Sequence, residues 1–161
     1  MNSEFCIAVH ALVFLNRKAC TVSSSVLAEN ICTNPARVRK VMAKLKKAGF
    51  VATREGLDGG YHMAADPKFV SLYLISEALD FQFVSSSWKS GDINMECLIA
   101  SGMGHVLGNI YQDLNTLCKE HLKSITIDNI DNEIFGSLFL NANVPCGQKS
   151  QDSGIVPQID R

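Results

Sequence analysis

The fold is decided by residues 34–61, which read NPARVRKVMAKLKKAGFVATREGLDGGY. The first half of this stretch predicts a helix over residues 36–48. Asn34 suits its N-cap position, Pro35 its first turn and Gly49 its end. Apolar residues recur inside the helix at helical spacing and define one buried face, made by Val38, Val41, Met42 and Leu45. Basic residues occupy the remaining faces, so the helix is expected to be amphipathic and basic.

The second half of the stretch changes from helical to strand periodicity. Residues 50–54 and 61–64 predict two short strands, and the residues between them, EGLDGG, are typical of a glycine-rich hairpin loop. A β-hairpin is therefore expected directly after the basic helix.

The neighbouring segments extend this pattern. Residues 4–16 are apolar nearly all round and predict a buried helix, and residues 24–30 predict a short helix capped by Ser23 or Ser24. The short helix and the basic helix, joined by a tight turn, form a helix-turn-helix candidate that the hairpin follows as a wing. With a further amphipathic helix over residues 71–80, the predicted fold class is mainly α with a small β-hairpin wing. The winged helix-turn-helix is expected over residues 1–80.

Charge is unevenly distributed along the chain. Residues 1–68 contain ten basic against five acidic side chains, whereas residues 69–161 contain five against eleven. Between Glu29 and Glu55 there are seven bases and no acid. Three of these bases, Arg37, Lys40 and Lys44, share a helix face opposite the apolar one, which predicts a surface that enters the major groove of DNA. A basic face that is merely solvated is the alternative.

The second half of the chain predicts a linker, a long helix and a tail. Residues 81–97 are polar and are expected to form a linker loop. Residues 98–142 are expected to hold a long helix, from about residue 101 to 123, and a shorter helix or turn near residues 131–140. The apolar stripe of the long helix predicts a dimerisation surface, with packing inside one chain as the alternative; its members are Met103, Leu107, Ile110, Leu114 and Leu117. Residues 143–161 are expected to be a flexible C-terminal tail.

Several motifs resemble those of the Rrf2 family of bacterial winged-helix repressors. They are Ala11-Leu12, Val38 to Val41, Leu45 to Val51 and Gly56 to Tyr61. The resemblance is strong over residues 2–80 and implies a homodimer whose long helices pair antiparallel. It also implies that the basic helices enter the grooves of double-stranded DNA at a near-palindromic operator. The expected DNA-binding residues are Asn34, Arg37, Arg39, Lys40, Lys44, Arg54, Gly59, Gly60 and Tyr61.

One position of the wing departs from the family pattern. Members often carry Arg just before the wing glycine, where this chain has Glu55, with Arg54 one residue earlier. The operator preference of a relative is therefore not carried over.

The six cysteines form no CxxC or CxxxC pair, so the sequence predicts no cysteine-only zinc site. Cluster-binding members of the family use three closely spaced cysteines before the long helix, but residues 81–105 contain Cys97 alone. We therefore expect no metal, no iron–sulphur cluster and no other cofactor. Cys32 precedes the basic helix, whose N-terminus favours thiolate, and some cluster-free members sense oxidants through cysteine. Cys32 and Cys97 are thus the candidate redox-sensing residues, with a small apolar plug as the alternative for Cys32.

Other function classes find less support. The GxSxG, P-loop and HExxH motifs are absent, so no enzyme is expected. The longest apolar run, residues 5–15, is too short to span a bilayer, and the start lacks the features of a signal peptide. We therefore expect a cytoplasmic protein without a membrane partner. Two alternatives to an oxidant-released repressor stay open, namely a regulator controlled by a small molecule or a protein effector, and a winged-helix protein-interaction module.

Overall fold

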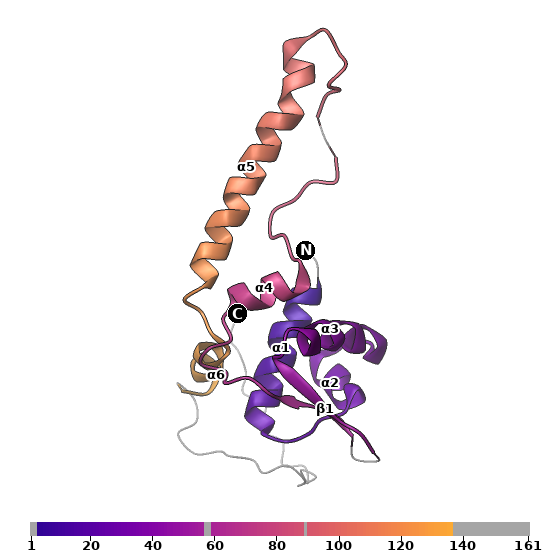
Figure 1. The fold of residues 1–161 in the computed structure, drawn as a ribbon, viewed down its shortest axis with the longest axis vertical. Coiled ribbons are helices and arrows are strands. Elements are labelled where there is room, and N and C mark those ends of the chain that lie inside the picture. Colours follow the sequence, from indigo (N-terminus) through magenta and orange to yellow (C-terminus); the bar gives the residue numbers. More distant parts are fainter. Residues whose placement is uncertain (1–2, 57–58, 89, 137–161) are drawn as a thin grey trace, which may run out of the picture.

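The structure is a computed structural model that describes residues 3–56, 59–88 and 90–136. Across these ranges the chain forms six helices and a two-stranded hairpin, in the order α1 (Ser3–Lys18), α2 (Ser24–Ile31), α3 (Pro35–Lys47), β1 (Val51–Arg54), β2 (Gly60–Met63), α4 (Leu72–Leu79), α5 (Leu98–Leu122) and α6 (Ile127–Gly136). Figure 1 shows a rounded body from which α5 projects as a long arm. The predicted class, mainly α with a small hairpin wing, is confirmed.

The caps of α2 and α3 follow the sequence signals. Ser23 is the N-cap of α2, and its Oγ accepts a hydrogen bond from the Val26 amide at 3.3 Å. Asn34 is the N-cap of α3, and its Oδ1 accepts from the Ala36 amide at 2.7 Å. These bonds satisfy amides that the first turn of a helix leaves without a partner. A short turn over residues 32–34 therefore joins the two helices of the helix-turn-helix.

Gly49 ends α3 as predicted. Its φ of 80° is left-handed, a conformation that glycine adopts at little cost. The Gly49 amide donates to the Lys46 carbonyl at 3.0 Å, and the Phe50 amide donates to the Leu45 carbonyl at 3.0 Å. This pair of bonds is a Schellman motif, which turns the chain from the helix directly into β1.

The hairpin is anchored to the body through its return strand. β1 pairs antiparallel with β2, with Val51 opposite Met63 and Arg54 opposite Gly60. Val22 and Tyr61 exchange two backbone hydrogen bonds of 2.8 Å, which tie β2 to the segment before α2. A Cβ at Gly60 would lie 2.3 Å from the Val22 carbonyl oxygen, so this close approach requires glycine. The base of the wing is thereby held against the helix-turn-helix.

The hydrophobic core lies in the body. Among the described residues, the buried apolar side chains all lie between Ile7 and Phe81, except Ile127. The core face of α3 is the predicted one and consists of Val38, Val41, Met42 and Leu45. By contrast, α5 has no buried residue along its 25 positions. None of the helices in the described ranges is long and apolar enough to cross a membrane.

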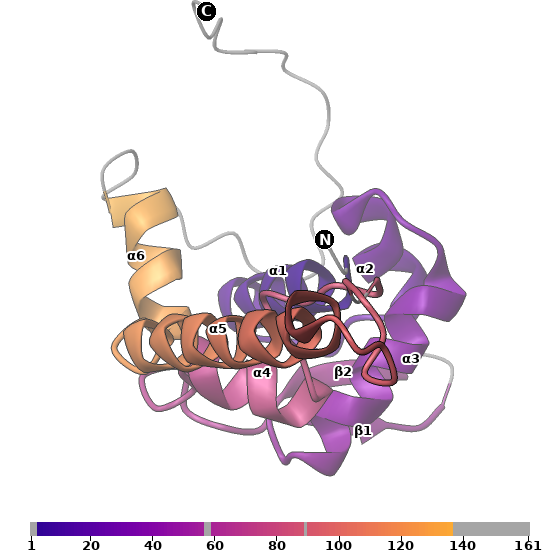
Figure 2. The same ribbon diagram turned by 90° about the horizontal axis from the view of Figure 1, so that it is seen from above.

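The segment after α5 returns to the body. Leu72 donates its amide to the Ile125 carbonyl at 2.8 Å, and Ile127 donates to the Val70 carbonyl at 3.0 Å. From there α6 packs against α1, on the side away from α2 and α3 (Figures 1 and 2). Residues 98–142 are predicted to hold the dimerisation helix and a following segment, and the described part of that segment, residues 125–136, contacts the winged helix. Residues 137–142 and the predicted tail 143–161 lie outside the described residues.

The start of the linker is fastened to the arm by one side chain of α5. Asn115 of α5 accepts hydrogen bonds from the Phe83 and Val84 amides, at 2.8 and 3.0 Å, and its side-chain amide donates to the Val84 carbonyl. Nearer the body, Lys119 of α5 pairs with Glu77 of α4 at 2.6 Å. These contacts hold the C-terminal part of α5 against the body, while its first turns extend away from it (Figure 1).

Candidate nucleic-acid interface

The basic side chains of α3 divide into two flanks. Because the core stripe fixes the rotation of the helix, Arg37, Lys40 and Lys44 line one flank, and Arg39 and Lys46 line the other. Arg37, Arg39, Lys40, Lys46 and Lys47 are exposed, whereas Lys44 is half-buried. A surface helix with bases on both flanks matches what a DNA major groove accepts.

The first flank faces the N-terminus of α1. Lys40 Nζ lies 2.8 Å from Glu4 Oε1, and Lys44 Nζ lies 2.7 Å from Glu4 Oε2. The guanidinium of Arg37 donates to the Ser3 hydroxyl. The hydrogen bond from Lys40, followed by that from Lys44, lowers the pKa of the Glu4 carboxyl below its ordinary value. The sequence pattern missed this acid because Glu4 lies 36 residues before Lys40 in the chain.

The second flank faces α2 and the wing. Arg39 donates to the Ser24 hydroxyl at 3.3 Å, and Lys46 donates to the Thr53 hydroxyl of β1 at 2.8 Å. These partners are neutral, and no salt bridge joins Arg39 or Lys46 to a carboxylate among the residues that the structure describes. Asn34, at the leading end of α3, uses its Oδ1 for capping and keeps its amide NH₂ group to donate.

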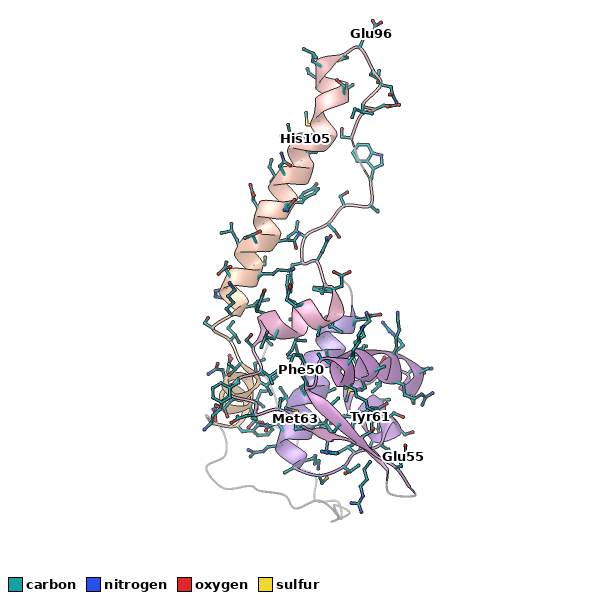
Figure 3. The ribbon with its side chains drawn as sticks, in the orientation of Figure 1. Phe50, Glu55, Tyr61, Met63, Glu96 and His105 are labelled. Carbon is teal, nitrogen blue, oxygen red and sulfur yellow. The ribbon has the colours of Figure 1, made fainter. Side chains whose placement is uncertain are left out.

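The wing presents Arg54 and Glu55 as exposed side chains. Figure 3 shows Glu55 toward the tip of the hairpin and Tyr61 closer to the body. Tyr61 is half-buried and packs against the core, and Gly60 is pressed against Val22. The structure thus gives Gly60 and Tyr61 a role in holding the wing, beside the DNA contact predicted for them.

The predicted stripe on α5 is largely open in the single chain. Four of its members are exposed and Leu107 is half-buried; the exposed fractions are 36% for Met103, 46% for Ile110, 40% for Leu114 and 66% for Leu117. Packing within one chain, the alternative for this stripe, therefore leaves most of it in water. Such a surface normally marks a contact with another molecule.

The two candidate redox residues lie at different helix ends. Cys32 ends α2 in a left-handed conformation, with a φ of 55°, and its side chain is exposed. Cys97 is the exposed N-cap of α5, where the amides of Ala100 and then Ile99 lower the pKa of its thiol. Figure 1 places the start of α5 at the end of the arm farthest from α2. Within one chain, the two thiols are therefore not brought together.

An apolar groove, which sequence reasoning did not anticipate, runs along α1. Its volume is about 810 Å³, and α1 and α6 supply most of its lining, including Val9, Val13, Phe14, Ile130 and Ile134. Cys6 and His10 of α1 also line it. The apolar spacing of residues 4–16 predicts a buried helix, but the described residues cover this face of α1 only in part.

Comparison with known proteins places this geometry in a family. A family model described as Rrf2, an iron-dependent transcriptional regulator, matches residues 1–133. YwnA of Bacillus subtilis strain 168, named as an HTH-type transcriptional regulator, is 25% identical over 135 residues, which cover 84% of this chain and 99% of YwnA.

The family description raises the question of iron, and the described residues do not fit it. Within these ranges, no three His, Cys, Asp or Glu side chains lie together as a possible metal site. Figure 3 shows Glu96 at the tip of the arm and His105 farther along α5. Cys97 is the one cysteine of residues 81–105. That the chain uses no cofactor stays a prediction.

Solved structures share the fold. A transcriptional regulator from Lactobacillus plantarum matches with a TM-score of 0.71 and 20% identity, over 83% of this chain and 91% of that one. IscR of T. potens matches with a TM-score of 0.63 and 20% identity, over 88% of this chain and 93% of that one. The helix-turn-helix, the wing and the family match all indicate a transcriptional regulator and not an enzyme. The chain belongs to the Rrf2 family of DNA-binding transcriptional regulators.

Proposed function

We propose that this regulator is a homodimeric repressor that binds a near-palindromic operator through α3 and the wing. The observation that carries the proposal is the exposed basic surface of α3, with Arg39 and Lys47 uncovered beside the exposed Arg54 of the wing. Bases on the sides of a groove-sized helix neutralise phosphates, and the leading end of the helix is placed to reach base edges. Asn34, with its free amide donors, and Arg37 stand at that leading end.

The exposed stripe of α5 supports the dimer. A helix of 25 residues with no buried side chain does not gain enough from its own chain to account for an apolar stripe. Pairing with the same helix of a second copy covers the stripe and creates two-fold symmetry. Two α3 helices related by such an axis would contact half-sites about one helical turn apart, which is why the operator is expected to be near-palindromic.

Selection of bound fragments from genomic DNA tests this function. We expect enrichment of an inverted repeat, and an affinity that falls linearly with the logarithm of salt concentration. If the retained fragments share no inverted repeat, the prediction of a near-palindromic operator is wrong. Failure to retain DNA at low salt would contradict the assigned surface and would favour the protein-interaction module.

The signal that releases the repressor is proposed to be an oxidant of the peroxide class. The Cys97 thiolate, favoured by the amides of α5, attacks a peroxide oxygen; an S–O bond forms, the O–O bond breaks and one water leaves after protonation. The Cys32 thiol then attacks that sulphur, forming the S–S bond and releasing the oxygen as a second water. Two thiols are thus oxidised by two electrons, and one peroxide is reduced.

This disulfide is proposed to join two subunits. A disulfide needs α-carbons within about 7 Å, whereas Cys32 ends α2 and Cys97 precedes the first turn of α5. Figure 1 shows α2 in the body and the start of α5 at the far end of the arm. A disulfide from the arm of one subunit to the turn before α3 of the other would fix that α3 helix relative to the dimer axis. Since operator binding depends on half-site spacing, such a lock is expected to release DNA.

Non-reducing gels after peroxide treatment test the redox step. We expect a covalent dimer in wild type that is lost in both Cys32→Ser and Cys97→Ser, while Cys6→Ser, another exposed thiol, retains it. Operator binding should fall on oxidation in wild type and in Cys6→Ser only. Equal operator affinity for oxidised wild type and oxidised Cys32→Ser would refute the switch.

One observation favours a second mode of control, by a small apolar effector. The groove between α1 and α6 has the volume and apolar lining of small-molecule sites. The fluorescent probe anilinonaphthalene sulfonate should bind there, and Val13→Trp should abolish the signal by filling the groove. An unchanged signal in that variant would place the probe elsewhere.

A further inference from the structure

We infer that Glu4 is a built-in competitor of DNA phosphate, which holds Lys40 and Lys44 of α3 and limits how strongly the protein binds DNA of any sequence. The inference rests on the proposed DNA surface and adds to it a positioning residue from outside the helix-turn-helix. Each carboxylate oxygen of Glu4 pairs with a different lysine, Oε1 with Lys40 at 2.8 Å and Oε2 with Lys44 at 2.7 Å.

The two lysines differ in how accessible they are. The side chain of Lys40 is 68% exposed, that of Lys44 is 35% exposed and that of Glu4 is 18% exposed. Lys40 can therefore leave the carboxylate for a phosphate by rotation of its own side chain. Lys44 also contacts the Leu79 carbonyl at 3.5 Å, which holds it closer to the body. A carboxylate and a phosphate cannot both be the near partner of one ammonium group without mutual repulsion.

Aromatic packing keeps Glu4 in place. Phe5, the next residue of α1, stacks on Phe81 with ring centroids 5.3 Å apart and meets Phe83 edge-on at 5.1 Å. Phe81 and Phe83 also pack edge-on, at 4.8 Å. The first turn of α1 is thus clamped to the start of the linker, so Glu4 presents its carboxylate to α3 from a fixed backbone and not from a loose chain end.

Competition by Glu4 predicts how the affinity for DNA depends on salt concentration. Each additional phosphate that a lysine neutralises contributes about 0.9 to the slope of log affinity against log salt, which corresponds to about eightfold in affinity near 0.1 M salt. We expect Glu4→Gln to bind a random-sequence duplex about eightfold more tightly for each lysine it frees, with a slope steeper by about 0.9 per lysine. Folding is checked by urea unfolding, and Glu4→Ala serves as a second variant with the same expectation.

A matched control separates local competition from net charge. Glu120→Gln removes the same charge and breaks the ion pair with Lys123, which lies at the end of α5 and not on α3, and should leave the affinity and slope unchanged. In a Lys40→Gln, Lys44→Gln background, Glu4→Gln should also have no effect, because the lysines that it restrains are gone.

Three results would overturn the inference. They are equal behaviour of Glu4→Gln and Glu120→Gln, weaker binding by Glu4→Gln, and an increase that persists without the two lysines. If the wild-type protein does not bind DNA at all, the proposed DNA surface is wrong. Failure of the proposed surface can therefore be distinguished from failure of the inference about Glu4.

Discussion

The body and the arm of this molecule use apolar side chains in opposite ways. In the body, α1, α3 and α4 bury theirs against one another, and Leu12, Leu45 and Ile75 have no exposed surface. In the arm, α5 carries apolar residues of the same types, yet none is buried and Leu117 is 66% exposed. Among the described residues, burial within one chain accounts for the apolar side chains of the body, whereas those of the arm fit the partner surface that we propose for it.

The body and the arm also differ in the candidate functional surfaces that they carry. The basic residues of α3 sit on the outer side of a helix whose inner side is core, so the DNA surface inherits its rigidity from the body. The arm carries the candidate dimer contacts and Cys97 on a helix whose described contacts include those of Asn115 with the linker and of Lys119 with α4, both in its C-terminal half. Changes in the two regions should therefore have different kinds of effect.

The largest expected change is in the free energy of unfolding, when a core leucine is truncated. Leu12→Ala should lower the free energy of unfolding by about 2–5 kcal/mol, because it removes buried methyl groups and leaves a cavity. Leu117→Ala makes the same chemical change on the arm and should cost less than about 0.5 kcal/mol in dilute, monomeric protein. Urea unfolding at two protein concentrations compares them. A large loss for Leu117→Ala on dilution would show that the arm is part of the core.

A smaller effect is expected at the surface of the body. Arg37→Ala should weaken operator binding by about 1–3 kcal/mol if the guanidinium reads a base, without a comparable change in binding of random DNA. Lys47→Ala, at the exposed end of the same helix, should weaken both equally and flatten the salt slope by about one unit. Titrations across salt concentrations distinguish the two. Unchanged operator affinity in both variants would remove α3 from the interface.

The smallest effect concerns pH, and it sharpens the contrast between two carboxyls of the body. Lys40 and Lys44 hold the pKa of Glu4 below its ordinary value of 4.5, so its stabilising contribution is present above that value and is lost as the pH falls through the folded pKa. Burial, opposed by Arg17, raises the pKa of Asp131, so protonation at acid pH favours the folded state there.

Variants test these opposite signs. Below about pH 4.5, Glu4→Gln should lose less stability than wild type does, because the group that titrates unfavourably is gone. Asp131→Asn should lose more than wild type over the same acid range. Urea midpoints across the range give the comparison. Identical acid dependence in all three proteins would show that neither carboxyl is linked to folding.

Much of the body could be predicted from sequence because its signals are local. Ser23 and Asn34 mark the starts of α2 and α3, and Gly49 marks the end of α3. The change from helical to strand periodicity then locates the hairpin to within one residue at each end. These features depend on backbone caps and on nearest-neighbour spacing, which a single sequence displays directly.

The remaining features depend on contacts that local patterns do not encode. α5 begins at Leu98, three residues before the predicted start, because its N-cap Cys97 is not one of the residue types that mark a helix start in a sequence. α6 begins at Ile127 and not near residue 131; the reciprocal bonds between Thr126 and Asn129, a variant of the capping box, were a signal that could have been used.

For the candidate DNA-binding surface, the sequence predicted the basic residues but not the side chains that they contact. The basic run of α3 was visible in the sequence, whereas the ion pairs of Glu4 and the tie from Lys46 to Thr53 require the packed fold. The groove along α1 was also invisible, because the apolar spacing of residues 4–16 does not show which face a later helix leaves uncovered.

The central claim is that the stripe on α5 makes the dimer on which operator binding depends. Sedimentation equilibrium of Ile110→Asp tests it most directly, with Asn109→Asp, an exposed neighbour that receives the same charge, as the control. We predict that Ile110→Asp is a folded monomer that no longer binds the operator, while Asn109→Asp remains a dimer that binds it. An Ile110→Asp protein that stays dimeric and retains its operator affinity would contradict the claim.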